Sequence, residues 1–152
     1  MEGPRKDVRG DVALVLEHAV EADVRLAFAW KFRTDVANWN DPPARFEIDG
    51  PFLDGTRGTT FLPGQPPLTW WVRDVVPERS FVIEMRLEDA VLHSEWHFDR
   101  VAEHATRLTQ RIVLAGRNAV AYVEQVRAGF GANLAAGMAK IARELVAAER
   151  AA

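Results

Sequence analysis

The sequence contains no cysteine among its 152 residues. Disulfide bonds, thiolate metal ligands and a cysteine nucleophile are therefore excluded. A chain without cysteine is compatible with the reducing cytoplasm, and we expect this protein to be cytoplasmic. The sequence also lacks a surplus of positive charge, because 19 Lys and Arg stand against 22 Asp and Glu. Nucleic-acid-binding domains normally carry a basic face, so we expect no nucleic-acid partner.

Long apolar runs are absent as well. No segment approaches the ~18–20 apolar residues that a membrane-spanning helix needs, and the polar opening MEGPRKDVRG does not resemble a secretory signal. We expect residues 1–9 to form a loose tail and residues 10–150 to form one domain.

Signatures of common catalytic sites are also missing. The sequence has no Gly-rich phosphate loop, no Ser-His-Asp arrangement and no pair of carboxylates on an apolar face. His93, Glu95 and His97 share one face of a predicted strand. On a straight strand the two histidines lie ~13 Å apart, which is too far to share one ion. We therefore expect no metal site and no cofactor.

Regular elements can be predicted along the whole chain. Alternating apolar residues indicate a first strand over about 10–18, and helix-forming residues follow over 22–32, with Val24, Ala27 and Phe28 as the apolar face. Thr34 or Asp35 can cap a second short helix that ends near residue 39.

The segment from residue 44 to residue 115 changes to a period of two. Such alternation, with short connections, predicts an antiparallel meander with one dry and one wet face. On the wet face we expect exposed pairs of Glu84, Glu95 and Asp99 with Arg86, Arg107 and Arg111.

A period of 3.6 returns after Gly116 and predicts one long amphipathic helix over 119–150. The dry face of the sheet must be buried against this helix, since no other segment is large enough.

Several short motifs add a resemblance to this pattern. They are Gly50-Pro51-Phe52, Gly55-Thr56-Arg57-Gly58-Thr59, Pro63-Gly64, Val75-Val76-Pro77 with Phe81, and Phe98-Asp99-Arg100 followed by Ala105-Thr106-Arg107-Leu108-Thr109. With the order of elements, they resemble the START-like SRPBCC superfamily over about residues 10–148, and most closely its polyketide cyclase/dehydrase-type proteins. The resemblance implies an α+β helix-grip fold. In this fold a curved antiparallel sheet of about seven strands wraps around a long C-terminal helix, with two short helices after the first strand.

The resemblance also implies a cavity between sheet and helix that accepts a small hydrophobic or aromatic ligand. We expect the following residues to contact it: Trp39, Trp70, Ile83, Met85, Ser94, Trp96, Leu108, Gln110, Phe130, Asn133, Gly137 and Ile141. Ser94, Gln110 and Asn133 would be polar handles, and Gly137, inside a helix, would leave room for the ligand.

Two alternatives to simple binding stay open. The first is a polyketide cyclase or aromatase acting in the same cavity, for which Tyr122 and Asn133 are the candidate catalytic residues. The second is a protein-interaction module that uses the convex face of the sheet or the rim of the helix. On the convex face the apolar residues are Trp71, Val82, Val91 and Val113. A homodimer is compatible with each of them.

Overall fold

The computed structural model describes residues 11–152; the tail predicted for residues 1–9 lies outside the described residues. The elements follow one another in this order: β1 (Val12–Ala22), α1 (Leu26–Arg33), the 3₁₀ turn η1 (Val36–Asn38), β2 (Arg45–Ile48), β3 (Arg57–Phe61), β4 (Leu68–Val76), β5 (Ser80–Leu87), β6 (Ala90–Ala102), β7 (Ala105–Ala115), η2 (Ala119–Tyr122), α2 (Val123–Val126), η3 (Arg127–Gly131) and α3 (Leu134–Ala151). No helix within residues 11–152 is long and apolar enough to cross a membrane.

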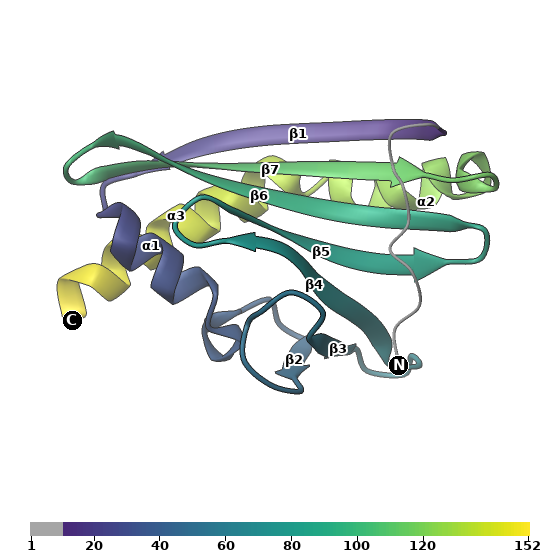
Figure 1. The fold of residues 1–152 in the computed structure, drawn as a ribbon, viewed down its shortest axis with the longest axis horizontal. Helices are drawn as coiled ribbons and strands as arrows, with labels where there is room; N and C mark the ends of the chain where they lie inside the picture. Colours follow the sequence, from purple (N-terminus) through teal and green to yellow (C-terminus); the bar gives the residue numbers. More distant parts are fainter. Residues whose placement is uncertain (1–10) are drawn as a thin grey trace.

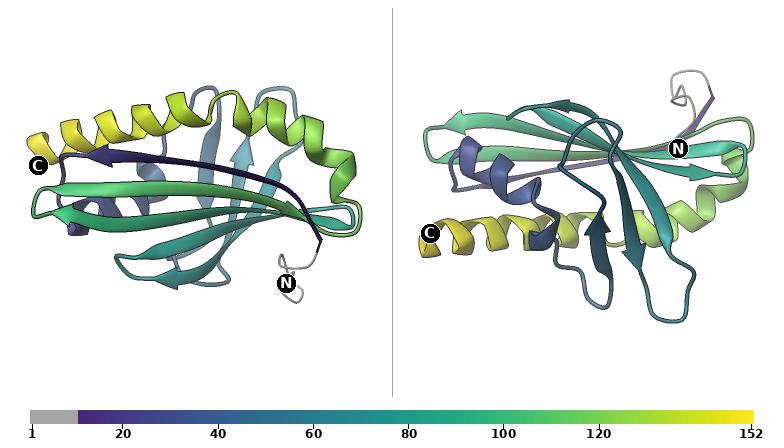
Figure 2. Two further views of the ribbon diagram at one scale, coloured as in Figure 1. Left: turned by 90° about the horizontal axis from the view of Figure 1, so that it is seen from above. Right: turned by 60° about the horizontal axis from the view of Figure 1, so that its bottom comes forward.

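All seven strands form one antiparallel sheet in the order β1-β7-β6-β5-β4-β3-β2. The middle strands form the predicted meander, while β1 closes the far edge by pairing with β7. The sheet is strongly curved, and α3 runs along its concave face (Figures 1 and 2). The predicted arrangement of a curved seven-stranded sheet around a C-terminal helix is therefore confirmed.

The second of the two short helices is smaller than expected. It is a single 3₁₀ turn, η1, whose first backbone N–H groups are capped by Asp35: the side chain accepts a hydrogen bond from the Ala37 N–H at 3.0 Å. Asp35 is thus the cap that the sequence proposed together with Thr34. The cis bond between Pro42 and Pro43 follows soon after, in the loop that leads to β2.

The buried face of α1 differs from the predicted one. Ala27 is exposed, and the side chains turned to the interior are Leu26, Ala29, Trp30 and Arg33. These positions follow the spacing i, i+3, i+4, i+7 that defines one side of a helix. The helix begins four residues later than predicted and ends one residue later. Of the three residues predicted for its apolar face, only Ala27 is wrong, because Val24 is buried just before the helix and Phe28 packs against the core.

The C-terminal helix is interrupted, whereas the sequence predicted one continuous helix over 119–150. A 3₁₀ turn and one turn of α-helix lead into a π-helical turn at Arg127–Gly131, and α3 begins only after Asn133. Two glycines, Gly129 and Gly131, lie in the π-helical turn, and glycine weakens the α-helix most among residues other than proline. The interruption lies beside the cavity described below.

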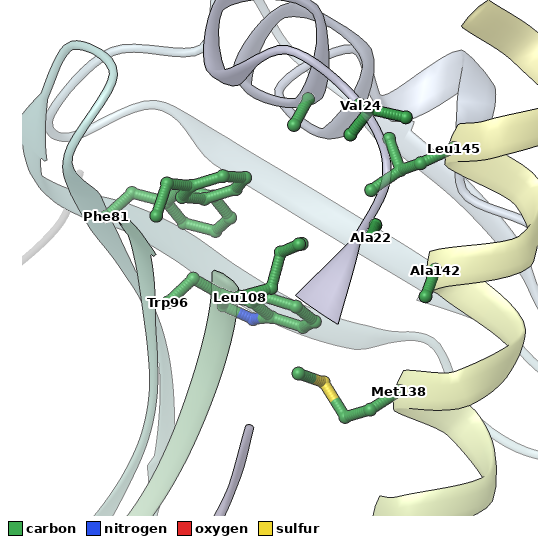
Figure 3. Packing of buried hydrophobic residues seen from close by; sticks show 10 residues of the cluster. Ala22, Val24, Phe81, Trp96, Leu108, Met138, Ala142 and Leu145 are labelled. Atoms are coloured by element: carbon green, nitrogen blue, oxygen red, sulfur yellow. The ribbon is translucent and has the colours of Figure 1, made fainter. Parts of the chain in front are cut away.

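The core between sheet and helix contains side chains from both layers. Phe81, Trp96 and Leu108 from the strands face Met138 and Leu145 of α3, and all five are at most 5% exposed (Figure 3). Trp30 of α1 adds an edge-on contact with Phe98 at a centroid distance of 5.2 Å. This packing fixes the end of the sheet near α1.

The convex face of the sheet is not exposed to solvent along its whole length. Glu84 is 0% exposed, and its carboxylate contacts His93 Nε2 at 2.9 Å, Arg86 Nε at 3.2 Å and Arg73 Nη2 at 3.3 Å. We call Glu84, Arg73, Arg86 and His93 the Glu84 cluster. The predicted pairing of Glu84 with Arg86 is present, but the prediction that it is exposed was wrong, because alternation shows which face a residue is on and not whether that face is covered. The other expected pairing is partly seen, as Glu95 lies opposite Arg111 with 3.4 Å between Oε2 and Nη1.

Candidate functional site

A cavity of about 430 Å³ lies between the concave face of the sheet and the C-terminal helical region. Strands β2 to β7 supply one wall, and η3 and α3 supply the other. Arg33 at the end of α1 and Trp39 just after η1 close one side. The volume lies within the ~300–1,000 Å³ range of pockets that hold small molecules.

The sheet side of the cavity is largely aromatic. Trp70 is 2% exposed and lies 5.2 Å from Trp39 between ring centroids. The Trp70 indole N–H donates a hydrogen bond to Thr60 Oγ1 at 3.0 Å, which fixes the ring against β3. Trp96 provides a second indole, stacked at 6.2 Å on Phe81 behind it. Flat apolar walls of this kind suit a planar ligand by contact area and by stacking.

Two polar side chains on the sheet form a pair. Gln110 Nε2 donates to Ser94 Oγ at 2.9 Å, between neighbouring strands β7 and β6. A hydroxyl and an amide have more hydrogen-bonding capacity than this single bond uses. The pair therefore leaves a hydroxyl hydrogen and an amide oxygen that can orient a ligand.

Arg33 brings a positive charge into the same cavity. It is 8% exposed, and its Cζ atom lies 4.8 Å from the Trp96 ring centroid and 5.7 Å from that of Trp39. Burial lowers the pKa of Arg33 from its ordinary value to about 10, and the negative charge of Glu144 limits this fall. The side chain is therefore still a cation at neutral pH.

Charged and amide groups line one rim of the cavity. Lys140 Nζ donates to the Asn40 carbonyl oxygen at 2.6 Å, and Asn40 Nδ2 donates to Glu144 Oε2 at 2.9 Å. These contacts join the loop after η1 to α3 across the opening. Asp41 lies on the same rim.

The structure places eleven of the twelve expected ligand contacts on the cavity wall. They are Trp39, Trp70, Ile83, Met85, Ser94, Trp96, Gln110, Phe130, Asn133, Gly137 and Ile141. Asn133 is exposed, so it lies at the opening rather than in the depth. Leu108, the twelfth, is 0% exposed and lies in the core beside Trp96 instead of on the wall (Figure 3).

Tyr122, a candidate catalytic residue, is not near Asn133 on the cavity wall. Its hydroxyl donates to the Glu88 carbonyl oxygen at 3.4 Å, and its ring packs against the apolar cluster around Leu114 and Val126. The two catalytic candidates are therefore not brought together. His93, part of the pattern weighed for a metal site, is engaged by Glu84 on the opposite face of the sheet.

Arg33 is the residue that sequence reasoning missed. In the segment WKFRTD it has the appearance of an ordinary surface arginine. The signal that could have found it is its spacing from Leu26, Ala29 and Trp30, which puts it on the buried face of α1. The charged rim residues Lys140 and Glu144 were missed for a related reason, since they flank the apolar stripe of α3.

Comparison with known proteins gives a likeness in structure only. No protein-family model and no curated protein matches the sequence. Norcoclaurine synthase from Thalictrum flavum, in complex with dopamine and hydroxybenzaldehyde, is 16% identical with a TM-score of 0.68, over 96% of this chain and 94% of that one. ZhuI aromatase/cyclase from Streptomyces sp. R1128 is 18% identical with a TM-score of 0.64, over 87% and 93%. Protein NE0264 from Nitrosomonas europaea is 14% identical with a TM-score of 0.67, over 91% and 97%. Identities this low show the fold alone: this chain has the helix-grip fold of the SRPBCC proteins.

Proposed function

We propose that the protein binds a small hydrophobic or aromatic molecule in the cavity between the sheet and the C-terminal helix. The observation that carries this proposal is the cavity itself, about 430 Å³ with indole rings and aliphatic side chains on its wall. A cavity of this kind costs the protein dispersion contacts, which a ligand would restore. The structure of norcoclaurine synthase, a protein of the same fold, has been determined in complex with two small aromatic molecules, dopamine and hydroxybenzaldehyde.

Binding is favoured over the cyclase alternative by the placement of the polar groups. A cyclase needs a proton donor and a proton acceptor that face the substrate. Tyr122 is directed to Glu88, while Lys140 and Glu144 at the rim are both engaged with Asn40. The interaction-module alternative loses support as well, because Val91 and Val113 on the convex face are each 1% exposed.

The first test is a change that fills the cavity. A Cβ atom added to Gly137 would meet nothing within 4 Å, so Gly137→Leu can extend into the open space without displacing a neighbour. We expect the variant to bind the neutral fluorescent probe N-phenyl-1-naphthylamine at least tenfold more weakly than the parent protein. Thermal stability should be kept, since leucine favours helix over glycine by up to ~1 kcal/mol.

The matched control is Ala136→Leu, which places the same side chain one residue earlier on the exposed side of α3. It should bind the probe like the parent protein. Equal probe binding by Gly137→Leu and the parent would contradict the assigned cavity.

Native mass spectrometry of the purified protein, followed by identification of any released small molecule, would name the class of ligand. The same spectra count protomers and so test the predicted homodimer; the cytoplasmic location stays a prediction, to be tested by cell fractionation.

A further inference from the structure

Arg33 presents a guanidinium group whose hydrogen-bonding needs are not met by the protein. It is more than nine-tenths buried on the cavity wall, and its Nε has no hydrogen-bond partner among residues 11–152. A buried polar group without a partner is rare in folded proteins, and a buried charge without one is costly. Such a group calls for an acceptor that the chain itself does not supply.

Backbone acceptors at the end of α1 are already engaged by other side chains. Three side chains donate to the last carbonyl oxygens of α1: Thr34 Oγ1 to Trp30 at 2.8 Å, Asn38 Nδ2 to Phe32 at 3.1 Å, and Trp39 Nε1 to Arg33 at 2.8 Å. The C-terminal end of the helix, a common partner for a basic side chain, is thus occupied.

Glu144 is the acidic side chain whose charge acts on Arg33. It affects Arg33 through its charge, but the contact it makes is the hydrogen bond from Asn40 at the rim. No ion pair of 4 Å or less joins Glu144 to Arg33 in the described part of the chain. Arg33 therefore lies deeper than the rim network and separate from it.

The aromatic rings beside Arg33 determine from which side a hydrogen-bond acceptor can approach its guanidinium group. The indole rings of Trp96 and Trp39 lie against the guanidinium group at 4.8 and 5.7 Å. A guanidinium group that stacks on aromatic rings keeps the N–H donors at its edge for hydrogen bonds in its own plane. A planar carboxylate matches that edge with two parallel hydrogen bonds.

We infer that the cavity ligand carries a carboxylate-type anionic group, which Arg33 binds, on a planar apolar body that lies along Trp70 and Ile83. This inference rests on the proposed function, because it names the chemical class of the molecule that the cavity binds. The Ser94–Gln110 pair lies on the same wall and can accept or donate a further hydrogen bond to a polar substituent of the ligand.

The experiment compares two ligands that differ only in charge. 2-Naphthoate and 2-naphthamide share one ring system and one shape, and each is used to displace N-phenyl-1-naphthylamine from the protein. We expect naphthoate to displace the probe at a concentration about 10- to 100-fold lower, as one or two charge-assisted hydrogen bonds at a buried site should give. The Arg33→Met variant should lose this preference, so that naphthoate and naphthamide displace the probe at similar concentrations.

Two further variants separate the roles that Arg33 can have. Arg143→Met removes one positive charge from the exposed side of α3 and should leave the preference for naphthoate unchanged. Arg33→Lys keeps the positive charge but lacks the planar guanidinium group that can donate two parallel hydrogen bonds. It should keep only part of the preference for naphthoate over naphthamide. Thermal unfolding of Arg33→Met without ligand should occur at the same temperature as the parent or a higher one, because an unpaired buried charge is removed.

The outcomes distinguish this inference from the proposed function. If the parent protein binds the neutral probe but does not prefer naphthoate to naphthamide, the inference is wrong and the proposed function stands. If Arg33→Met is destabilised and both naphthalenes lose affinity equally, Arg33 is a structural link between Trp39 and Trp96, and the inference is wrong again. If the neutral probe does not bind at all, the proposed function fails and the inference fails with it.

Discussion

Replacement of Glu84 by glutamine is expected to lower the free energy of unfolding by about 3 kcal/mol or more at neutral pH. The carboxylate is fully buried and contacts two guanidinium groups and one imidazole at 2.9 to 3.3 Å. Glutamine keeps the size of the side chain but removes the negative charge that these groups surround. Urea denaturation at pH 7 measures the effect.

The matched control is Glu17→Gln on β1. The Glu17 side chain is 58% exposed and faces Arg111 at 3.7 Å, so its loss should change the free energy of unfolding by less than ~1 kcal/mol. A loss for Glu84→Gln no larger than that of Glu17→Gln would show that the Glu84 cluster contributes little to stability.

The same carboxylate predicts how stability changes in acid. Burial alone would raise the pKa of Glu84, but the hydrogen bond to His93, the charges of Arg73 and His93 and the hydrogen bond to Arg86 outweigh it and lower the pKa from 4.5 to about 2. Because the pKa is lower in the folded state, the contribution of Glu84 is complete above about pH 4.5 and is lost as the pH falls towards 2. The difference in unfolding free energy between the parent and Glu84→Gln should therefore shrink by about 3 kcal/mol over that interval. A constant difference between pH 5 and pH 2 would contradict this assignment.

A second large effect is expected from Gly58→Ala. A Cβ atom at Gly58, which pairs with Trp70 across β3 and β4, would overlap the Trp70 ring atoms Cη2, Cζ2 and Cζ3. Trp70 is 2% exposed and is held by Trp39 and by the hydrogen bond to Thr60, so its ring can move away from a Cβ atom at Gly58 only by giving up these contacts. We expect a loss of about 1–3 kcal/mol in the free energy of unfolding, as for other overpacked cores, together with altered indole fluorescence.

Gly50→Ala serves as the control for this substitution. A Cβ atom at Gly50 would meet only Thr56 Cγ2, at an ordinary contact distance of 3.7 Å, so stability should change little. If the overlap with Trp70 is the cause, a Trp70→Phe background should reduce the cost of Gly58→Ala, because phenylalanine lacks the outer ring of indole. If Gly58→Ala lowers the free energy of unfolding equally in the parent and in the Trp70→Phe variant, the overlap with Trp70 is not the cause.

Most of the sheet could be predicted because alternation is a local property. Phe81, Ile83 and Met85 lie on the concave face, and their even spacing is enough to predict it. The face of the sheet that turns to the helix followed from the same rule, whereas a cavity between sheet and helix was expected only from the resemblance to the SRPBCC superfamily. Leu108 lies on the concave face as predicted, but at the end of the sheet that packs against α1 and α3. Alternation cannot distinguish this part of the concave face from the part that lines the cavity.

The sequence could not show how charged residues become buried. Glu84 has a partner two residues away, Arg86, but a Glu-x-Arg pair on a strand is equally typical of an exposed face, so it does not mark Glu84 as interior. The contacts of Arg33 come from Trp39 and Trp96, and those of Glu84 from strands β4, β5 and β6. Their burial depends on where three or more separate segments meet, which no single window of sequence contains.

The closure of the sheet by β1 has a consequence for synthesis on the ribosome. Val12 pairs with Ala115 and Ala22 with Thr106, so within this sheet the strand that is synthesised first pairs with the strand that is synthesised last. The hairpins from β4 to β7 can form as soon as each strand emerges, whereas β1 has to wait with its apolar residues exposed to water. Contacts between distant segments also carry a larger entropic cost of loop closure and form more slowly. In this chain the N-terminal strand is therefore the one that chaperones have the longest time to bind.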